Sequence, residues 1–121
     1  MARNWRSGNK YGAKKTWVDD IKFDSKREAN RYIYLKNAVA AGEISDLELQ
    51  PRYNLIINDR PVLLRSKGYP NGRKCYYKAD FRYKDADGIT IIEDVKGMDT
   101  PAAKLKRSVV ECIYGIRIDL T

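Results

Sequence analysis

The sequence has no histidine, only two cysteines and no apolar run long enough to span a bilayer. Without histidine, the chain cannot build a Ser-His-Asp triad, a Cys-His pair or an imidazole zinc site. Any catalysis must therefore use carboxylates, Lys, Tyr or Cys, and any metal ion must be held by oxygen ligands.

The two cysteines lack the spacing of a metal or redox motif. Cys75 and Cys112 are far apart and belong to no CxxC pattern, so we expect reduced thiols. The basic N-terminal residues also lack the apolar segment of a secretory signal. We therefore expect a cytoplasmic protein without a membrane partner.

Basic residues outnumber acidic residues by 24 to 16, which gives the 121-residue chain a net charge of +8. Residues 1–15 and 60–78 contain basic and aromatic side chains but no acid. Cations neutralise phosphates and flat rings stack on bases, so this mixture favours DNA as the partner. The basic residues expected to contact DNA are Lys14, Lys15, Arg65, Lys67, Arg73 and Lys74. The alternative is a solvated basic face whose rings turn inward.

Composition divides the chain into a short arm and one domain. Residues 1–18 are rich in Gly, Asn and Lys and predict a flexible basic arm. Residues 19–121 are enough for a single core but leave little room for a second.

A capping-box spacing predicts the first helix, over residues 25–41. Ser25 stands three residues before Glu28, and Gly42 can end the helix. At about 100° per residue, Glu28 falls on the apolar stripe and is expected to face the protein body. The residues of this stripe are Glu28, Ala29, Tyr32, Ile33, Leu35, Val39 and Ala40.

Alternation and turn residues predict several strands and a second helix. The expected strands are residues 44–50, 53–57, 75–83, 89–96 and 116–120. Pro51 should break or bulge the ribbon, and residues 58–72 predict a long or hairpin-like basic loop. Pro101 and Gly115 bracket a helix over residues 102–114. The order of helix, strands, helix and strand predicts one α/β domain.

The strand at residues 89–96 carries the most informative charges. Alternation places Asp94 and Lys96 on one face and Glu93 on the other. Asp80 lies on the strand joined to this one by a hairpin and could supply a second oxygen ligand. Carboxylate oxygens suit Mg²⁺ or Mn²⁺, which can activate water for phosphodiester hydrolysis. The alternative is a surface ion pair between Asp94 and Lys96.

Four sequence blocks resemble a family of small phage and prophage proteins of the PD-(D/E)XK nuclease-like superfamily. The blocks are Phe23–Glu28, Gly42–Pro51, Ala79–Phe81 and Ile92–Gly97. The resemblance covers residues 8–121 and implies a restriction-endonuclease-like αβββαβ core, with a mixed central sheet flanked by helices. It also implies a divalent-metal site at one edge of the sheet.

The resemblance assigns roles residue by residue. Glu28 matches the glutamate of the first helix, Asp80 the aspartate of the PD element, and Asp94 and Lys96 the (D/E)XK pair. Gln50 resembles an auxiliary polar residue near the site. The chain departs from the pattern at the residue before Asp80, which is alanine where the superfamily name expects proline.

The residues and the resemblance together suggest a Mg²⁺-dependent DNA endonuclease of phage origin, acting in the host cytoplasm on branched or nicked DNA. Asp80, Asp94, Glu28 and the carbonyl of Val95 are the expected metal ligands, Mn²⁺ should substitute for Mg²⁺, and Lys96 should position the water. A homodimer is a reasonable expectation, because many such enzymes pair two subunits to cut two strands. The alternatives are a non-catalytic nucleic-acid-binding protein or a phage assembly protein that retains the nuclease fold.

Overall fold

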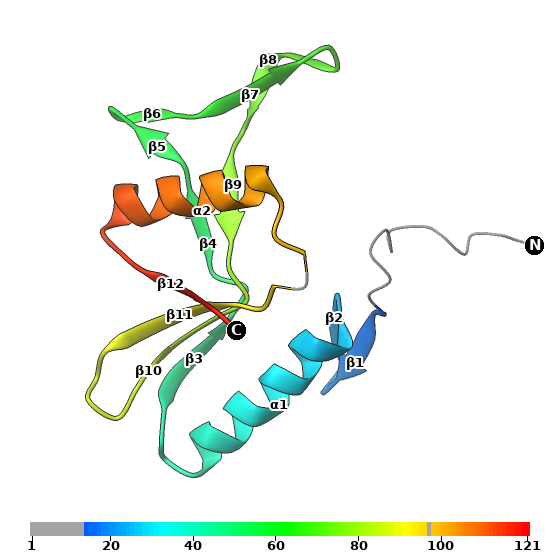
Figure 1. The fold of residues 1–121 in the computed structure, drawn as a ribbon, viewed down its shortest axis with the longest axis vertical. Helices are drawn as coiled ribbons and strands as arrows, with labels where there is room; N and C mark the ends of the chain where they lie inside the picture. Colours follow the sequence, from blue (N-terminus) through cyan, green and yellow to red (C-terminus); the bar gives the residue numbers. More distant parts are fainter. Residues whose placement is uncertain (1–13, 97) are drawn as a thin grey trace, which may run out of the picture.

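The described residues form two helices, a mixed four-stranded sheet and a long β ribbon that projects from the sheet (Figure 1). The structure is a computed structural model and describes residues 14–96 and 98–121. Most of the predicted basic arm, residues 1–13, lies outside the described residues, as does Gly97. No helix in the described ranges is long and apolar enough to cross a membrane.

The predicted arm boundary at residue 18 is wrong, because it falls inside a hairpin. Strand β1 (Thr16–Val18) pairs antiparallel with β2 (Ile21–Phe23), and Thr16 lies opposite Phe23. Phe23 is buried against α1, which anchors the hairpin to the domain. Residues 16–18 therefore belong to the folded unit.

Helix α1 (Lys26–Ala40) begins where the capping pattern predicts. The Ser25 hydroxyl accepts a hydrogen bond from the Glu28 backbone N–H at 3.1 Å. The predicted apolar stripe is partly wrong, since Ile33 and Val39 are exposed. The face of α1 that packs on the sheet includes Ala38, which is buried, and Arg31, which was expected on the solvent side. The Arg31 guanidinium donates two hydrogen bonds to the buried Glu93 carboxylate of the sheet.

The four-stranded sheet has the order β12–β11–β10–β3. Its strands are β3 (Ser45–Leu49), β10 (Phe81–Lys84), β11 (Thr90–Asp94) and β12 (Ile118–Leu120). The β3–β10 and β10–β11 pairs are antiparallel, whereas β11 and β12 are parallel. Two parallel neighbours need a crossover, and helix α2 (Pro101–Tyr114) provides it.

The two helices belong to different clusters of buried side chains. Phe81 and Tyr83 of β10 pack with α1, whereas Ile92 of β11 and Ile118 of β12 pack with Val110 of α2. Alternation along β11 explains this division, because successive side chains point to opposite faces of the sheet. The domain is thus α+β, with two helices and a mixed sheet, and not the α/β arrangement predicted from the order of elements.

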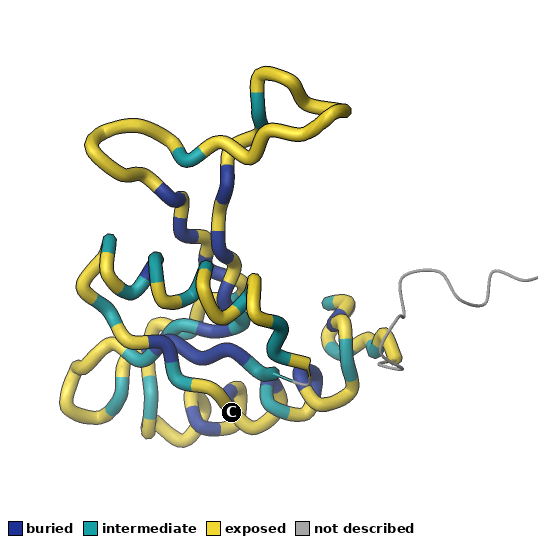
Figure 2. Tube along the Cα trace, turned by 45° about the horizontal axis from the view of Figure 1, so that its top comes forward, coloured by how far each residue is buried: buried dark blue, intermediate teal, exposed yellow. Residues whose placement is uncertain are grey.

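The ribbon is the segment between β3 and β10. Its strand pairs are β4 (Arg52–Asn54) with β9 (Tyr76–Lys78), β5 (Ile56–Ile57) with β6 (Arg60–Pro61), and β7 (Leu63–Ser66) with β8 (Tyr69–Lys74). Figure 2 shows that the ribbon rises from the core and that its outer part is largely exposed. The predicted loop at residues 58–72 is therefore part of two short hairpins. Gly72 makes the outer one possible, because a Cβ there would lie 2.8 Å from the Leu63 Cβ.

Candidate active site

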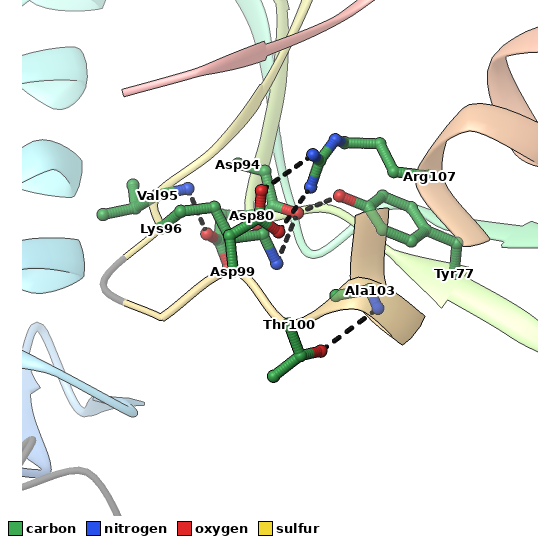
Figure 3. A network of polar contacts seen from close by, with 9 residues as sticks. All are labelled: Tyr77, Asp80, Asp94, Val95, Lys96, Asp99, Thr100, Ala103 and Arg107. Atoms are coloured by element: carbon green, nitrogen blue, oxygen red, sulfur yellow. Dashed lines mark hydrogen bonds and ion pairs between the residues drawn. The ribbon is translucent and has the colours of Figure 1, made fainter. Parts of the chain in front are cut away.

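Three carboxylates and one lysine gather at one end of the sheet. Asp94 is the last residue of β11, and Lys96 follows it by two residues. Asp80 lies between β9 and β10, where its N–H donates to the Glu93 carbonyl at 3.0 Å. Glu28 enters from the first turn of α1. Figure 3 shows Asp80, Asp94 and Lys96 close together, with Tyr77 reaching Asp94 from the other side.

The Asp94 carboxylate is almost fully buried, with 3% of the residue exposed. Its Oδ2 atom lies 3.1 Å from the Lys96 ammonium and accepts a hydrogen bond from the Tyr77 hydroxyl. Asp94 and Lys96 thus form a partly buried ion pair, and not the surface pair considered as the alternative. The burial of Tyr77 and its contact with Asp94 raise the pKa of its hydroxyl, so it stays a donor.

Asp80 shares its surroundings with Asp94. The Val95 N–H donates to the Asp80 Oδ2 atom at 2.6 Å. Burial, a hydrogen bond with the Asp94 carboxyl group and the negative charge of Glu28 together raise the pKa of Asp80 far above its ordinary range. The Asp80 carboxyl group thus holds its proton to a higher pH than an exposed aspartate does.

Glu28 is buried without a polar partner for its carboxylate. Only 7% of the residue is exposed, yet among the described residues no hydrogen bond or ion pair reaches its side chain. Burial, and then the negative charges of Asp24 and Asp94, raise its pKa to about 7, while the charge of Lys78 lowers it. Glu28 therefore does not complete a capping box with the Ser25 N–H.

The donor set fits a divalent cation. Asp80 and Asp94 offer carboxylate oxygens, and no described residue donates a hydrogen bond to the Val95 carbonyl oxygen. In the described part of the chain, however, no three acidic or cysteine side chains are already close enough to hold a metal ion together. Burial, and then the neighbouring negative charges, raise the pKa values of Asp80 and Glu28, and a cation between the carboxylates would favour their ionised forms against both effects, which is why the residues suit such an ion.

The backbone that carries the site is fixed by several polar contacts. The Arg27 guanidinium donates to the carbonyl oxygens of Lys96 and Thr121, each at 3.2 Å. The Thr121 N–H donates to the Asp94 carbonyl at 3.1 Å. These contacts connect α1, the end of β11 and the residue after β12, so they restrain the chain immediately after Asp94.

A basic cleft opens beside the carboxylates. It has a volume of about 440 Å³ and lies between the inner part of the ribbon and the beginning of α2. Its cationic lining residues are Arg73, Lys74, Lys78, Lys96 and Lys106. Tyr77 and Lys96 line the cleft and also contact Asp94, so the cleft is continuous with the carboxylate site.

The residues predicted to contact DNA are distributed over three places. Arg73 and Lys74 line the cleft, whereas Arg65 and Lys67 lie farther out on the exposed β7–β8 hairpin. Lys14 and Lys15 are exposed immediately before β1, and the Lys15 Nζ atom lies 3.7 Å from the Asp24 Oδ1 atom. The structure thus brings only two of the six to the cleft.

The predicted auxiliary residue, Gln50, acts through its backbone. Its N–H donates to the Asp80 carbonyl at 2.9 Å, and its φ of 53° places it in the left-handed region. Among the described residues, no hydrogen bond reaches its side chain. Gln50 therefore helps to hold the bend at Asp80, and its amide is not part of the polar contacts around the carboxylates.

Two residues at or near the site had no individual role in the sequence-based prediction. Tyr77 belongs to the segment 60–78, whose rings were expected to stack on bases, but it is buried and its hydroxyl donates to Asp94. Arg107 of α2 makes two hydrogen bonds of 2.9 Å to Asp99, as Figure 3 shows. The alternation of Cys75, Tyr77 and Ala79, all buried on one face of the ribbon, was the available signal for Tyr77.

The fold and site define a small α+β protein with acidic side chains gathered beside a basic cleft. The chain belongs to the family described as "Protein of unknown function (DUF1064)", which matches residues 8–119. Comparisons with curated proteins and with solved structures give no match.

Proposed function

We propose that this protein is a divalent-metal-dependent DNA endonuclease of the PD-(D/E)XK type. The observation that carries the proposal is the convergence of Asp80, Asp94 and Lys96 at the end of β11, next to a cleft lined by cations. Acidic side chains can hold a metal ion there, and the cleft can hold the phosphates of the substrate. Mg²⁺ is the expected ion, and Mn²⁺ should substitute for it.

The order of the elements supports this proposal. With the ribbon and the N-terminal hairpin set aside, the elements run α1, β3, β10, β11, α2 and β12. This order supports the αβββαβ core that the sequence resemblance implies, because the two helices also pack in separate clusters with alternate residues of the mixed sheet. Asp80 then immediately precedes β10 and Asp94 ends β11, and these two strands are antiparallel neighbours, as expected for a PD element beside a (D/E)XK element.

The ligands for the metal would be the carboxylates of Asp80 and Asp94 and the carbonyl oxygen of Val95, with Glu28 nearby. When bound, a divalent ion lowers the pKa of water and offsets the negative charge that develops on the phosphate. These are the two requirements for hydrolysis of a phosphodiester bond.

The chain's own groups would handle the water and the proton. The Lys96 ammonium can donate a hydrogen bond that orients the attacking water, and its charge also attracts the phosphate. Glu28, with a pKa of about 7, exists in both protonation states near neutral pH and can accept the proton that the water loses. The oxygen–phosphorus bond to the leaving strand then breaks as the bond to the water oxygen forms, and the leaving oxygen takes a proton from solvent water.

The proposed substrates are branched or nicked DNA, because the cleft beside the carboxylates is lined by cations, and contacts to phosphates carry no sequence information. Purified protein should be incubated with linear, nicked and four-way-junction DNA in Mg²⁺, in Mn²⁺ and in excess chelator. We expect cleavage only with a divalent ion. Cleavage in excess chelator would exclude the proposal, and binding without cleavage in either metal would favour the non-catalytic alternative.

Variants at the two aspartates test the assignment of the site. We expect Asp94→Asn and Asp80→Asn each to lower the cleavage rate by about 10³-fold, since each removes an anionic ligand worth several kcal/mol to the transition state. DNA binding should be retained in both variants. Asp46→Asn is the matched control, because Asp46 is exposed at the opposite end of β3 and asparagine tolerates its φ of 54°. Wild-type rates in both site variants would contradict the assignment.

A further inference from the structure

The cleft beside the carboxylates has two walls from different parts of the chain. Arg73, Lys74 and Lys78 come from the ribbon, whereas Lys106 comes from α2. Lys96 lines its inner end and lies 3.1 Å from Asp94. A polyanion that entered the cleft would therefore be held by cations on both sides and would reach the carboxylate site.

The cleft is too small for a double helix. Its volume of about 440 Å³ is that of a pocket for one small molecule. The major groove, which is only part of the width of a B-DNA duplex, is itself about 12 Å wide, more than a compact cleft of this volume spans. The cleft therefore has room for a short piece of one strand, and a duplex would have to remain outside it.

An aromatic ring in the wall favours unpaired nucleotides. Tyr76 lines the cleft and is 40% exposed, and the Arg52 guanidinium lies 3.9 Å from the centroid of its ring. Cationic grooves with aromatic rings are the usual binding sites for single strands, because only unpaired bases have free faces for stacking. Within a duplex the bases already stack on one another, so they offer no free face to this ring.

We propose that the cleft between the ribbon and α2 binds a short single-stranded segment of the substrate and leads its backbone to Lys96. This inference rests on the proposed nuclease function and specifies its substrate class as DNA with unpaired nucleotides beside a duplex. Lys106 is the phosphate-binding residue on the α2 wall.

Binding can be measured without metal, which separates this inference from the proposed catalysis. Wild-type protein is titrated in chelator with a fluorescent 12-nucleotide oligothymidylate and with a blunt 12-base-pair duplex. We expect Lys106→Ala to weaken oligothymidylate binding by about fivefold or more. The slope of log binding constant against log salt concentration should also become shallower by about 0.7, the value for one phosphate contact on a single strand. Tyr76→Leu should weaken the same binding by about tenfold, because stacking on the ring is removed.

Lys104→Ala is the matched control. Lys104 is an exposed lysine on the same helix that does not line the cleft. We expect this variant to bind oligothymidylate as the wild type does. Equal losses of affinity in Lys104→Ala and Lys106→Ala, or a wild-type affinity for oligothymidylate no greater than for the duplex, would overturn the inference.

Cleavage provides the second readout. With Mg²⁺, wild-type protein should cut a duplex that carries a single-stranded flap at least about tenfold faster than the fully paired duplex, and Lys106→Ala should reduce this ratio. An unchanged ratio in Lys106→Ala would overturn the inference. If no substrate is cut in any metal, the proposed function fails, whereas the binding result still decides whether the cleft takes a single strand.

Discussion

Glu28 shows how one residue can satisfy a sequence motif and yet serve another purpose. Its backbone N–H completes the cap by donating to the Ser25 hydroxyl, as the spacing predicts. Its carboxylate makes no hydrogen bond to the cap among the described residues; it is buried, and burial raises its pKa to about 7. The backbone and the side chain of this residue can therefore be tested separately.

We expect Glu28→Gln to lower the cleavage rate by at least about 10²-fold, because the amide cannot accept a proton or supply an anionic ligand. The melting temperature at pH 8 should stay the same or rise, since the variant no longer buries a charge there. Cleavage assays and thermal unfolding of the same preparation measure both effects.

Ser25→Ala is the complementary variant. It removes the hydroxyl that accepts from the Glu28 N–H and should cost about 1 kcal/mol in the free energy of unfolding. Cleavage at a temperature well below the melting point should be retained. A fully active Glu28→Gln protein would leave Glu28 with only its backbone N–H contribution to the helix cap.

Local periodicity was sufficient to predict some contacts but not others. The pairing of Asp94 with Lys96 follows from strand alternation, because both residues belong to one segment. The contact from Tyr77 to Asp94 joins the base of the ribbon to the end of β11. It could not be predicted, since it depends on how two separate elements pack. The same limit applies to Arg31, whose partner Glu93 is far away in sequence.

The elements with strong end signals were predicted best. Helix α2 begins at Pro101 after a Thr100 cap and ends at Gly115, which has a φ of 63°. The inner part of the ribbon was predicted as strands, but residues 58–72 were expected only as a hairpin-like loop, because the outer strands bury almost nothing. A strand is identified in a sequence by alternating apolar and polar residues, and this alternation arises only where one face of the strand is buried.

The outer hairpin of the ribbon, β7–β8, can be removed to test its role. Replacing residues 64–73 with Asn-Gly would join Leu63 to Lys74 by a two-residue turn, and these two residues are already paired. We expect the melting temperature to change by only a few degrees, because every residue of β7 is exposed. The slope of log binding constant against log salt concentration for duplex DNA should become shallower by about 0.9 for each phosphate that the shortened protein no longer neutralises.

A second variant tests whether the hairpin contributes to DNA binding through its positive charges or through its shape. The triple substitution Arg65→Gln, Lys67→Gln and Arg73→Gln keeps both strands and removes three cations. It should reproduce the reduced salt dependence of the shortened ribbon. An unchanged salt dependence in both variants would mean that the hairpin does not contact DNA.

At the scale of the whole molecule, the buried acids connect stability to pH and to metal. The pKa of Glu28 in the folded protein is about 7, compared with an ordinary value of 4.5. A group whose pKa is raised on folding stabilises the protein at low pH, and this stability is lost as the pH rises through the folded value. Asp80, whose pKa is also raised, acts in the same direction.

We therefore expect the free energy of unfolding in chelator to fall between pH 5 and pH 8, as measured by urea denaturation. The ion-paired acids Asp19, Glu48 and Asp99 have lowered pKa values and act at more acidic pH, outside this window. Millimolar Mg²⁺ should restore stability mainly at the higher pH, because the ion binds the ionised carboxylates. Glu28→Gln should flatten the pH dependence in chelator, and an identical slope in this variant would contradict the assignment.

The order of the elements could be predicted from the sequence, but their relative positions could not. Caps, turns and alternation identified both helices and the strands of the sheet in sequence. The position of the ribbon beside α2, which creates the cleft, depends on the bend at Gln50 and Asp80. The positive φ of Gln50 could not be predicted, because glutamine rarely adopts this backbone conformation.

The ribbon is inserted in the sequence between β3 and β10, two strands that pair directly with each other in the sheet. A single cut by trypsin after Lys67, in the exposed turn of the outer hairpin, would divide the chain into two fragments. The fragments would stay associated through the β3–β10 ladder and the contacts of Arg31 with Glu93 and of Arg27 with Lys96. We expect brief digestion to give two bands on a denaturing gel and one peak in gel filtration. Such a nicked form would allow each half of the protein to be labelled or substituted independently and then reassembled.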